Sequence, residues 1–236
     1  MTTTELTTIP FQSHNHDAGK GQNETEVMQP THDLYKTLNQ CCLIMMGIGA
    51  IRLVDTLSII VTDKVLMPET INTVLSYAST GVMLACIITY CRFMGRAMSN
   101  VHAVRGSDGL MSPRAVWLWC FAPIFSLWKP YVGVRQILTA GSDSGQIDAE
   151  TDNNMKIWWY CWAGSGVLSV LALGWITDAS MNELITEAQL LSGVAKWGVI
   201  INALQLVAFY SFTKLAERID EDQAALVSGG IAREFA

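Results

Sequence analysis

The sequence contains little charge. Asp, Glu, Lys and Arg account for 15% of the 236 residues, whereas roughly 25% is usual in a soluble domain. Hydrophobic residues account for 50%, and they stand in long blocks instead of the short periodic patterns of a globular core. This composition disfavours a soluble protein. The net charge is −6 and no basic domain stands out, so we expect no nucleic-acid partner.

The sequence also lacks the motifs of several chemistries. It contains no Walker loop, no GxSxG and no HExxH motif, which favours a non-enzymatic protein but leaves a membrane enzyme open. Its six cysteines lie in or beside apolar blocks, where a thiol behaves as a small hydrophobe, so neither a disulfide framework nor a zinc site is expected. The apolar blocks contain no histidine that could hold a haem. We therefore expect no metal and no cofactor.

Four apolar blocks are long enough to cross a membrane. About 20 helical residues span the hydrocarbon layer, and a helix satisfies its own backbone hydrogen bonds there. No alternating pattern suggests a barrel. The sequence therefore predicts an all-α polytopic membrane helix bundle. The four blocks are approximately Cys41–Val61, Ile71–Cys91, Ile157–Ile176 and Val194–Phe212.

Polar segments divide the chain around this bundle. Residues 1–40 are rich in Thr, Asn, Gln and Gly and predict a disordered cytoplasmic tail. The bundle is expected to occupy residues 41–212, with a solvated linker at 141–154. Residues 213–236 predict a cytoplasmic C-terminal helix or tail.

A tryptophan-rich stretch lies between the second and third blocks. As a helix, residues 115–128 would measure about 21 Å, which is shorter than the hydrocarbon layer of ~30 Å. A proline in its middle and a Lys-Pro pair at its end also break a helix. We therefore expect a Pro-broken re-entrant or interfacial segment over residues 112–138. Its characteristic residues are Trp117, Pro123, Trp128, Pro130 and Tyr131.

The distribution of Lys and Arg tests this expectation, because basic residues near helix ends collect on the cytoplasmic side. If the segment returns to the side from which it entered, ten basic residues share one side and two lie opposite, whereas a crossing gives six on each side. We therefore expect four transmembrane helices plus the re-entrant segment, with both termini cytoplasmic. Five crossings are the alternative. The ten are Lys36, Arg92, Arg96, Arg105, Arg114, Lys129, Arg135, Lys156, Lys214 and Arg218, and the two are Lys64 and Lys196.

The middle of the chain resembles a known family. The segments FMGRAMSNVHAV (Phe93–Val104) and SPRAVWLWCFAPIFSLWKPYVGVRQI (Ser112–Ile137) are similar to domain-of-unknown-function family 4328, which comprises bacterial multi-spanning membrane proteins. Gln136 stands where that family usually has Glu, Met94-Gly95 replaces a more aromatic pair, and Ser126 takes a place often held by Asn. The resemblance implies a protein of the bacterial inner membrane and no known reaction. It is carried by Arg96, Asn100, Trp117, Phe121, Pro123, Trp128, Pro130, Tyr131 and Arg135.

A basic face is predicted where the second helix leaves the membrane. Arg92, Arg96 and Asn100 follow one another four residues apart, so they share one side of a helix. Anionic lipid headgroups are the nearest ligand for such a face, and an acidic partner is a second candidate. The plain interpretation is the positive-inside signal of any polytopic protein. The predicted binding residues are Arg92, Arg96, Asn100, Arg105, Lys129 and Arg135, with Arg114 beside them.

Polar residues also lie inside the spans. Arg52 and Asp55 stand three apart in the first span, where they share a face and can form a pair. Asn202 and Gln205 have the same spacing in the last span and could extend a polar network. Such groups either hold helices together or line a path for an ion or substrate, and a contact with a partner protein is the third reading.

Together these observations favour a non-enzymatic binding or scaffold protein of the bacterial inner membrane. Its partners would be membrane lipids at the basic cytoplasmic face, with a partner protein or a second copy as further candidates. A small transporter or channel subunit that uses Arg52 and Asp55 is the first alternative. A membrane enzyme acting on a lipid is the second.

Overall fold

The computed structural model describes residues 29–62, 65–122, 124–142, 145–181 and 185–234, the last five as backbone only. Within these ranges every regular element is a helix. Two short helical pieces and a medium-length helix separate two pairs of long helices. The elements are α1 (His32–Thr62), α2 (Glu69–Arg105), α3 (Ala115–Leu118), the 3-10 turn η1 (Phe125–Leu127), α4 (Lys129–Gly141), α5 (Ala149–Met181) and α6 (Glu187–Glu234).

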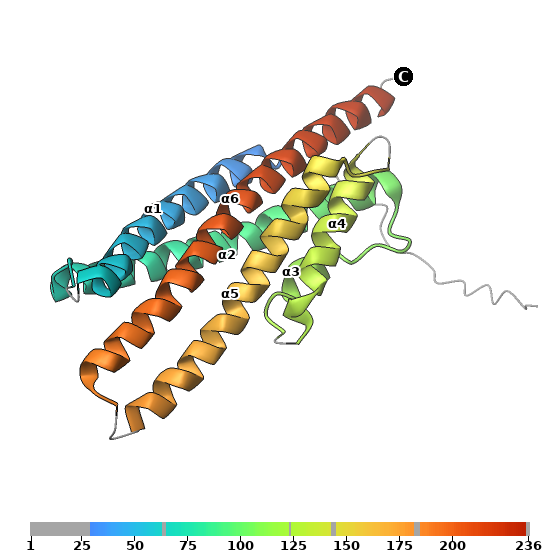
Figure 1. Cartoon of the computed structure of the whole chain (residues 1–236). Helices are drawn as coiled ribbons and strands as arrows, with labels where there is room; N and C mark the ends of the chain where they lie inside the picture. Colours follow the sequence, from blue (N-terminus) through green and yellow to red (C-terminus); the bar gives the residue numbers. More distant parts are fainter. Residues whose placement is uncertain (1–28, 63–64, 123, 143–144, 182–184, 235–236) are drawn as a thin grey trace, which may run out of the picture.

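The four long helices α1, α2, α5 and α6 are each long and apolar enough to cross a membrane. They form an elongated bundle in which α6 packs along both α5 and α1, and α1 packs along α2 (Figure 1). The structure therefore confirms the predicted all-α fold with four membrane-spanning helices.

One end of the bundle brings together the start of α1, the end of α2, the start of α5 and the second half of α6. Near the start of α1, the Thr31 hydroxyl donates to Oδ1 of Asp220 on α6 at 2.7 Å. From α2, Nη1 of Arg96 donates to the Pro30 carbonyl oxygen at 3.1 Å. We call this part the closed end. The end of α1, the start of α2, the end of α5 and the start of α6 lie away from it, at what we call the open end (Figure 1).

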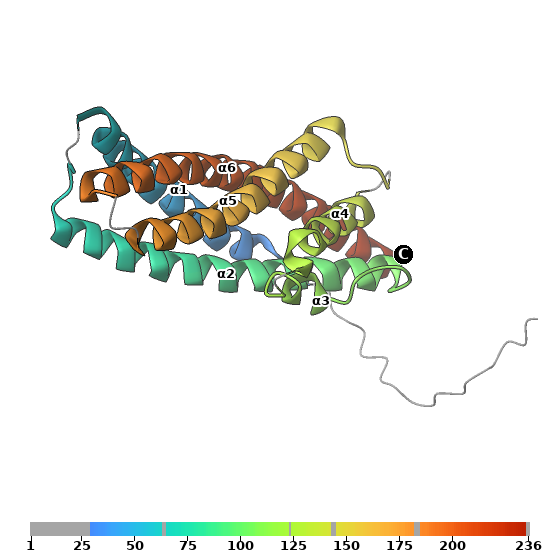
Figure 2. The same cartoon turned by 60° about the horizontal axis from the view of Figure 1, so that its bottom comes forward.

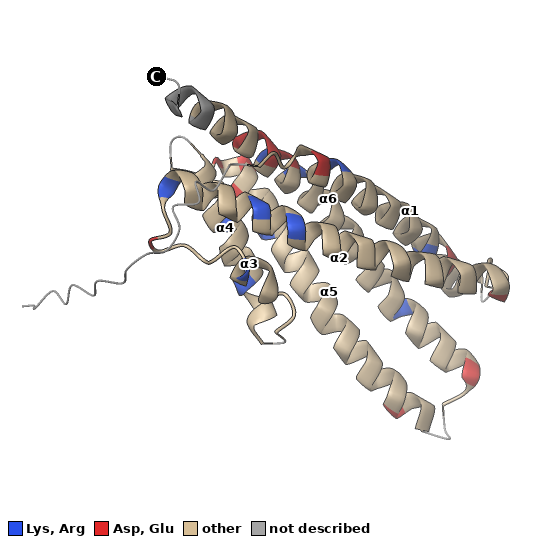
Figure 3. Ribbon diagram, turned by 180° about the vertical axis from the view of Figure 1, so that it is seen from behind, with Lys and Arg blue, Asp and Glu red and all other residues tan. Residues whose placement is uncertain are grey.

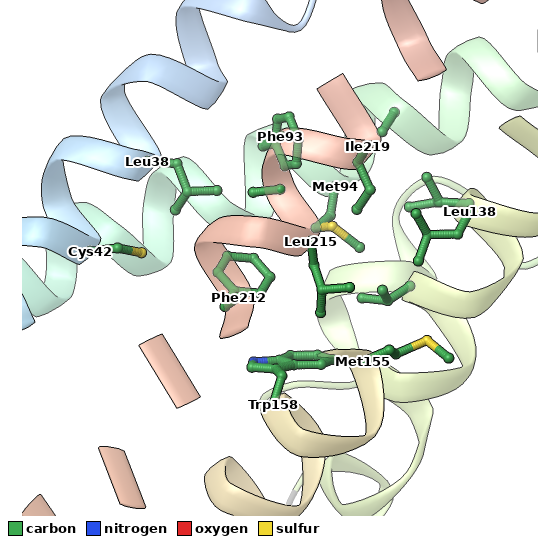
Figure 4. Packing of buried hydrophobic residues seen from close by; sticks show 14 of the residues in the cluster. Leu38, Cys42, Phe93, Met94, Leu138, Met155, Trp158, Phe212, Leu215 and Ile219 are labelled. Atoms are coloured by element: carbon green, nitrogen blue, oxygen red, sulfur yellow. The ribbon is translucent and has the colours of Figure 1, made fainter. Parts of the chain in front are cut away.

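The hydrophobic core lies at the closed end. Leu38, Phe93, Met94, Met155 and Leu215 are completely buried there, and Figure 4 shows their side chains gathered between helices. By contrast, at most 11% of the most apolar stretch of each long helix is buried inside the protein. Lipid tails are as apolar as the side chains of these stretches. In a membrane, the side chains can therefore face outward at little cost in free energy.

The helices extend beyond the boundaries that hydropathy predicts. α1 begins at His32, within the segment 1–40 expected to be a tail, and α5 begins at Ala149, within the expected linker 141–154. α6 continues past residue 213, and Leu215 and Ile219 on that extension are fully buried in the core. The reason is that these polar helix ends pack on protein and not on lipid, so hydropathy does not mark them. Residues 1–28 lie outside the described part of the chain.

The tryptophan-rich segment folds as a hairpin, which we define as residues 115–141, with α3 and α4 as its legs. The 13 residues of α4 measure about 20 Å, too short to cross. The legs approach closely at Gly133, where a Cβ atom would lie 2.6 Å from Cγ2 of Val116. Arg105, at the end of α2, donates to the carbonyl oxygens of Ala140 and Ser142, both at 3.2 Å.

The end of α4 therefore lies beside the end of α2, which agrees with a re-entrant or interfacial segment and not with a fifth crossing. Figure 2 shows α3 against α2, with α4 next to it. Pro123, expected to break this segment, lies outside the described residues.

Candidate functional site

The face of α2 that carries Arg92, Arg96 and Asn100 meets the hairpin at the closed end, but these three residues differ in their surroundings. Asn100 is 3% exposed. Its Nδ2 donates to the Gln29 carbonyl oxygen and to Oε1 of Gln223, both at 2.9 Å, and its Oδ1 accepts from the Gln29 backbone N–H at 3.1 Å. Asn100 is thus a clamp between α2, α6 and the segment before α1. Arg92 is exposed and Arg96 is half-buried.

A groove runs between α2 and α3, with a volume of about 960 Å³. The indole ring of Trp117 lies over Gly95, where a Cβ atom would be 3.5 Å from Cδ1 of the ring. Three arginines lie along the groove, and Ile87, Ile88 and Phe121 give it an apolar end. None of the described residues that line it is acidic. These lining residues are Gln29, Ile87, Ile88, Cys91, Arg92, Gly95, Arg96, Ser99, Asn100, Ala103, Pro113, Arg114, Trp117 and Phe121.

The sequence pattern predicts the three arginines of this groove but not its apolar end. The signal was present, since residues 88, 92, 95, 99 and 103 recur at helical spacing and therefore share the face of the arginine stripe. What the sequence does not indicate is that Trp117 and Phe121 of the hairpin close the other side.

The other predicted basic residues lie outside the groove. Arg105 binds the carbonyl oxygens that end α4, where a cation also meets the negative end of the helix dipole. Lys129 places its Nζ 5.7 Å from the centre of the Trp119 ring. Arg135 is exposed on α4. Figure 3 shows that Lys and Arg gather where α2, α3 and α4 meet, so the basic face exists but divides into separate sites.

The loop between α2 and α3 is held against α4 by Gln136. The side chain accepts a hydrogen bond from the Met111 backbone N–H at 3.0 Å and donates one to the Gly109 carbonyl oxygen at 3.3 Å. His102 Nε2 lies 2.8 Å from the Met111 carbonyl oxygen. An ionised Glu at position 136 could accept but not donate. The Gln136 amide can therefore make both hydrogen bonds to the loop, whereas a glutamate could make only the one to the Met111 N–H.

The tip of the hairpin presents apolar side chains outward. Leu118, Phe121, Ile124, Phe125, Leu127 and Trp128 are 41 to 68% exposed. Pro130 is buried, while Tyr131 packs against Trp159 with ring centres 6.1 Å apart. These six side chains are therefore open to the surroundings of the protein, which suits an interfacial segment.

A family model described as a domain of unknown function, DUF4328, matches residues 62–221. The chain belongs to the DUF4328 family. The match covers α2, the hairpin, α5 and most of α6, and it confirms the resemblance carried by the middle of the sequence. Neither the curated proteins nor the solved structures contain a match to this chain.

The intramembrane polar residues of this DUF4328 protein do not form the expected pair. Arg52 Nη2 donates to Oγ of Ser76 on α2 at 2.9 Å. Asp55 Oδ1 accepts from the backbone N–H groups of Leu66 and Met67, at 3.0 and 3.1 Å. Thus each charge joins α1 to a later part of the chain, Arg52 to α2 and Asp55 to the connecting loop. This geometry favours a role in holding the open end together.

The expected extension of this network through α6 is also missing among the described residues. Asn202 is half-buried on α6 and makes no hydrogen bond there to Arg52 or Asp55. Gln205 lines a different cavity, between α2, α5, α6 and the hairpin. The four intramembrane polar residues are therefore not brought together in one site.

Proposed function

We propose that this DUF4328 protein is a non-enzymatic membrane protein that binds an anionic lipid in the groove between α2 and α3. The observation that carries the proposal is a groove with Arg92, Arg96 and Arg114 along it, an apolar end, and no acidic residue among the described residues that line it. An anion with an attached hydrocarbon chain matches both parts of this groove. The outward-facing apolar hairpin tip beside it supports a position in the lipid layer.

Charge is the main reason to expect a phospholipid headgroup. Each Lys or Arg near an anionic surface is worth about 1 kcal/mol, or about fivefold in affinity. Arg96 uses one of its donors on Pro30, and a guanidinium has five N–H donors in total, so donors remain for a phosphate. The Arg92 and Arg114 side chains make no ion pair with an acidic residue in the described ranges.

The test compares matched charge removals in the full-length protein in detergent. Native mass spectrometry would measure bound phosphatidylglycerol against bound phosphatidylcholine. The variant Arg92→Gln/Arg114→Gln should lose about tenfold or more of its phosphatidylglycerol binding, at about fivefold for each arginine. Arg135→Gln removes an exposed charge outside the groove and should change binding little. Equal losses in both variants, or no preference for the anionic lipid in the wild type, would show that the groove is not the site.

The orientation is part of the same proposal. The closed end, with both described chain ends and most of the Lys and Arg residues, would face the cytoplasm of a bacterial cell from the inner membrane. Single cysteines at Ser142 and Ser180, in a background without native thiols, would be labelled with an impermeant maleimide. The proposal requires Ser142→Cys to be protected in intact cells and Ser180→Cys to react. The reverse pattern, or equal reactivity, contradicts it.

A further inference from the structure

A second cavity lies directly behind the hairpin, enclosed by α2, α5 and α6. Its volume is about 620 Å³, within the range of about 300–1,000 Å³ that is usual for sites of small organic ligands. Within the described part of the chain, its lining contains no Lys, Arg, Asp or Glu. Apolar and aromatic side chains dominate it, among them Tyr90, Phe121, Trp158, Trp162, Phe209 and Phe212. Figure 4 shows two of these, Trp158 and Phe212, side by side at the edge of the core, with ring centres 5.4 Å apart.

The polar groups of this cavity are few. The Ser165 hydroxyl donates to the Trp162 carbonyl oxygen at 2.8 Å. The Tyr90 hydroxyl oxygen accepts from Sγ of Cys120 at 3.8 Å, and Gln205 provides the one side-chain amide in the described lining. The cavity therefore suits a ligand part that is mostly apolar.

The second cavity and the basic groove adjoin each other. Ile87, Cys91 and Phe121 line both. Going along α2 from the closed end, the surface changes from Arg96 and Arg92 to Cys91 and Ile87, with Phe121 of the hairpin beside them, and then to the cavity behind the hairpin. A single amphiphilic molecule could therefore occupy both, with its charge in the groove and its hydrocarbon in the cavity.

We propose that the cavity behind the hairpin holds one hydrocarbon chain of an anionic phospholipid whose phosphate lies at Arg92, Arg96 and Arg114. This inference rests on the proposed function and adds to it. The lipid is taken partly out of the bilayer, because one of its chains lies between α2, α5, α6 and the hairpin. Charge complementarity at the groove selects the headgroup, and the apolar lining behind Phe121 selects the chain.

Two glycines of α5 allow a matched test of the chain site. Gly166 lines the cavity, whereas Gly174, two turns further on, does not. Neither would have any atom within 4 Å of an added Cβ, and replacing glycine inside a helix favours the helix by up to about 1 kcal/mol. Gly166→Leu and Gly174→Leu should therefore both fold, while only the first fills part of the cavity.

The measurement is phosphatidylglycerol binding to each full-length variant by native mass spectrometry. Gly166→Leu should reduce binding by about fivefold or more, as expected when a side chain is forced into occupied space. Gly174→Leu should bind as the wild type does. Unchanged binding in Gly166→Leu would overturn the proposal for the chain. If Arg92→Gln/Arg114→Gln still loses binding in that case, the headgroup site survives and only the chain site fails.

A second measurement locates the chain directly. The probe is phosphatidylglycerol with a photoreactive diazirine near the end of one acyl chain, added to the full-length protein in phosphatidylcholine nanodiscs. Crosslinks should map to the α5 stretch 162–170, and an excess of unlabelled phosphatidylglycerol should suppress them. Crosslinks spread evenly over outward faces, such as residues 71–80 of α2, would mean that the chain stays in the surrounding bilayer, and the proposal would be abandoned.

Discussion

The closed end and the open end of this bundle are held together by different kinds of contact. At the closed end, large side chains such as Phe93 and Leu215 interlock with no exposed surface. At the open end, helices meet through small residues. The ring of Trp175 lies over Gly193, and a Cβ atom at Gly198 would be 3.1 Å from Cγ2 of Thr56.

The difference agrees with the proposed orientation, in which the closed end lies in water and the open end lies in lipid. Burying apolar surface stabilises a structure strongly in water, so the closed end has the core of a small soluble domain. In lipid that force is absent, and close packing of small residues takes its place. Several polar groups differ in the same way. Asn100 and Gln223 bond across 123 positions of the chain, whereas the hydroxyls of Thr80 and Thr177 bond to carbonyls of their own helices. Arg52 and Asp55 are exceptions, because they join different segments at the open end.

The sharpest test of this comparison replaces one leucine at each end by alanine. Leu215→Ala, at a fully buried position, should destabilise the protein by about 2–5 kcal/mol because it leaves a cavity. Leu173→Ala, at a position 65% exposed, should change stability little. The measurement is the midpoint of denaturation in a titration with sodium dodecyl sulfate. Equal losses at the two positions would remove the distinction between the ends.

The polar clamp should have the next largest effect. Asn100→Ala leaves the buried Gln223 Oε1 and the Gln29 backbone groups without their partner, at a cost of about 1–3 kcal/mol for each buried group left unpaired. Thr177→Ala removes a hydroxyl bonded within its own helix and should have little effect. The same denaturation titration compares them, and hydrogen exchange should show α1 and α6 separating near Thr31. A wild-type exchange pattern in Asn100→Ala would contradict the assignment of this residue as a clamp.

At the open end, a single methyl group should disturb the contact between α5 and α6. In Gly193→Ala the new Cβ meets the Trp175 ring, which must move. We expect the free energy of unfolding to fall by an amount near the lower end of the range of about 1–3 kcal/mol that is usual for overpacking. Gly174→Ala, where the Cβ meets nothing within 4 Å, should instead be neutral or slightly stabilising. Near-ultraviolet circular dichroism follows the tryptophan environment, and the denaturation midpoint follows stability. If both variants behave alike, the two helices do not pack as described.

The smallest expected effect concerns the N-terminal caps of α5 and α6, whose contributions to stability should depend differently on pH. At the start of α5, the Thr151 backbone N–H and hydroxyl donate to Asp148 at 2.9 and 2.7 Å, and these bonds lower the pKa of the carboxyl. Because the folded pKa lies below the unfolded value of about 3.9, the cap contributes fully above that pH and is lost as pH falls through the folded pKa. Asp148→Ala should therefore cost about 1 kcal/mol at neutral pH and progressively less in acid.

The cap of α6 provides the comparison. Thr186 and Gln189 bond reciprocally, with the Thr186 N–H donating to Oε1 of Gln189 at 3.0 Å and the Gln189 N–H donating to Oγ1 of Thr186 at 3.3 Å. Neither side chain titrates, so Thr186→Ala should cost a similar amount at every pH. Hydrogen exchange in the first turn of each helix, measured between pH 3 and 7, gives both values. A pH-independent loss in Asp148→Ala would refute the carboxylate cap.

Much of the membrane part can be predicted from the sequence, because the length of a hydrophobic run and the position of breaking residues depend on few forces. The four spans, the short Trp-rich segment and the basic surroundings of α2 are recognisable in this way. The closed end is harder to foresee, since Gln29, Asn100 and Gln223 meet only after three distant segments pack together. Spacing likewise puts Arg52 and Asp55 on one face of α1. Their hydrogen bonds to Ser76 and to the backbone N–H of Leu66 depend on where α2 and the preceding loop lie, which spacing does not indicate.

The core of the closed end depends on residues that follow the last apolar block. Leu215 and Ile219 are fully buried there, yet they come after Val194–Phe212, the last apolar block of the sequence. During synthesis, the insertion machinery can therefore receive all four apolar blocks before Leu215 and Ile219 are made. Until then, Leu38 and Phe93 lack these two members of their hydrophobic cluster. A chain shortened at residue 212 is therefore expected to enter the membrane with an incomplete core.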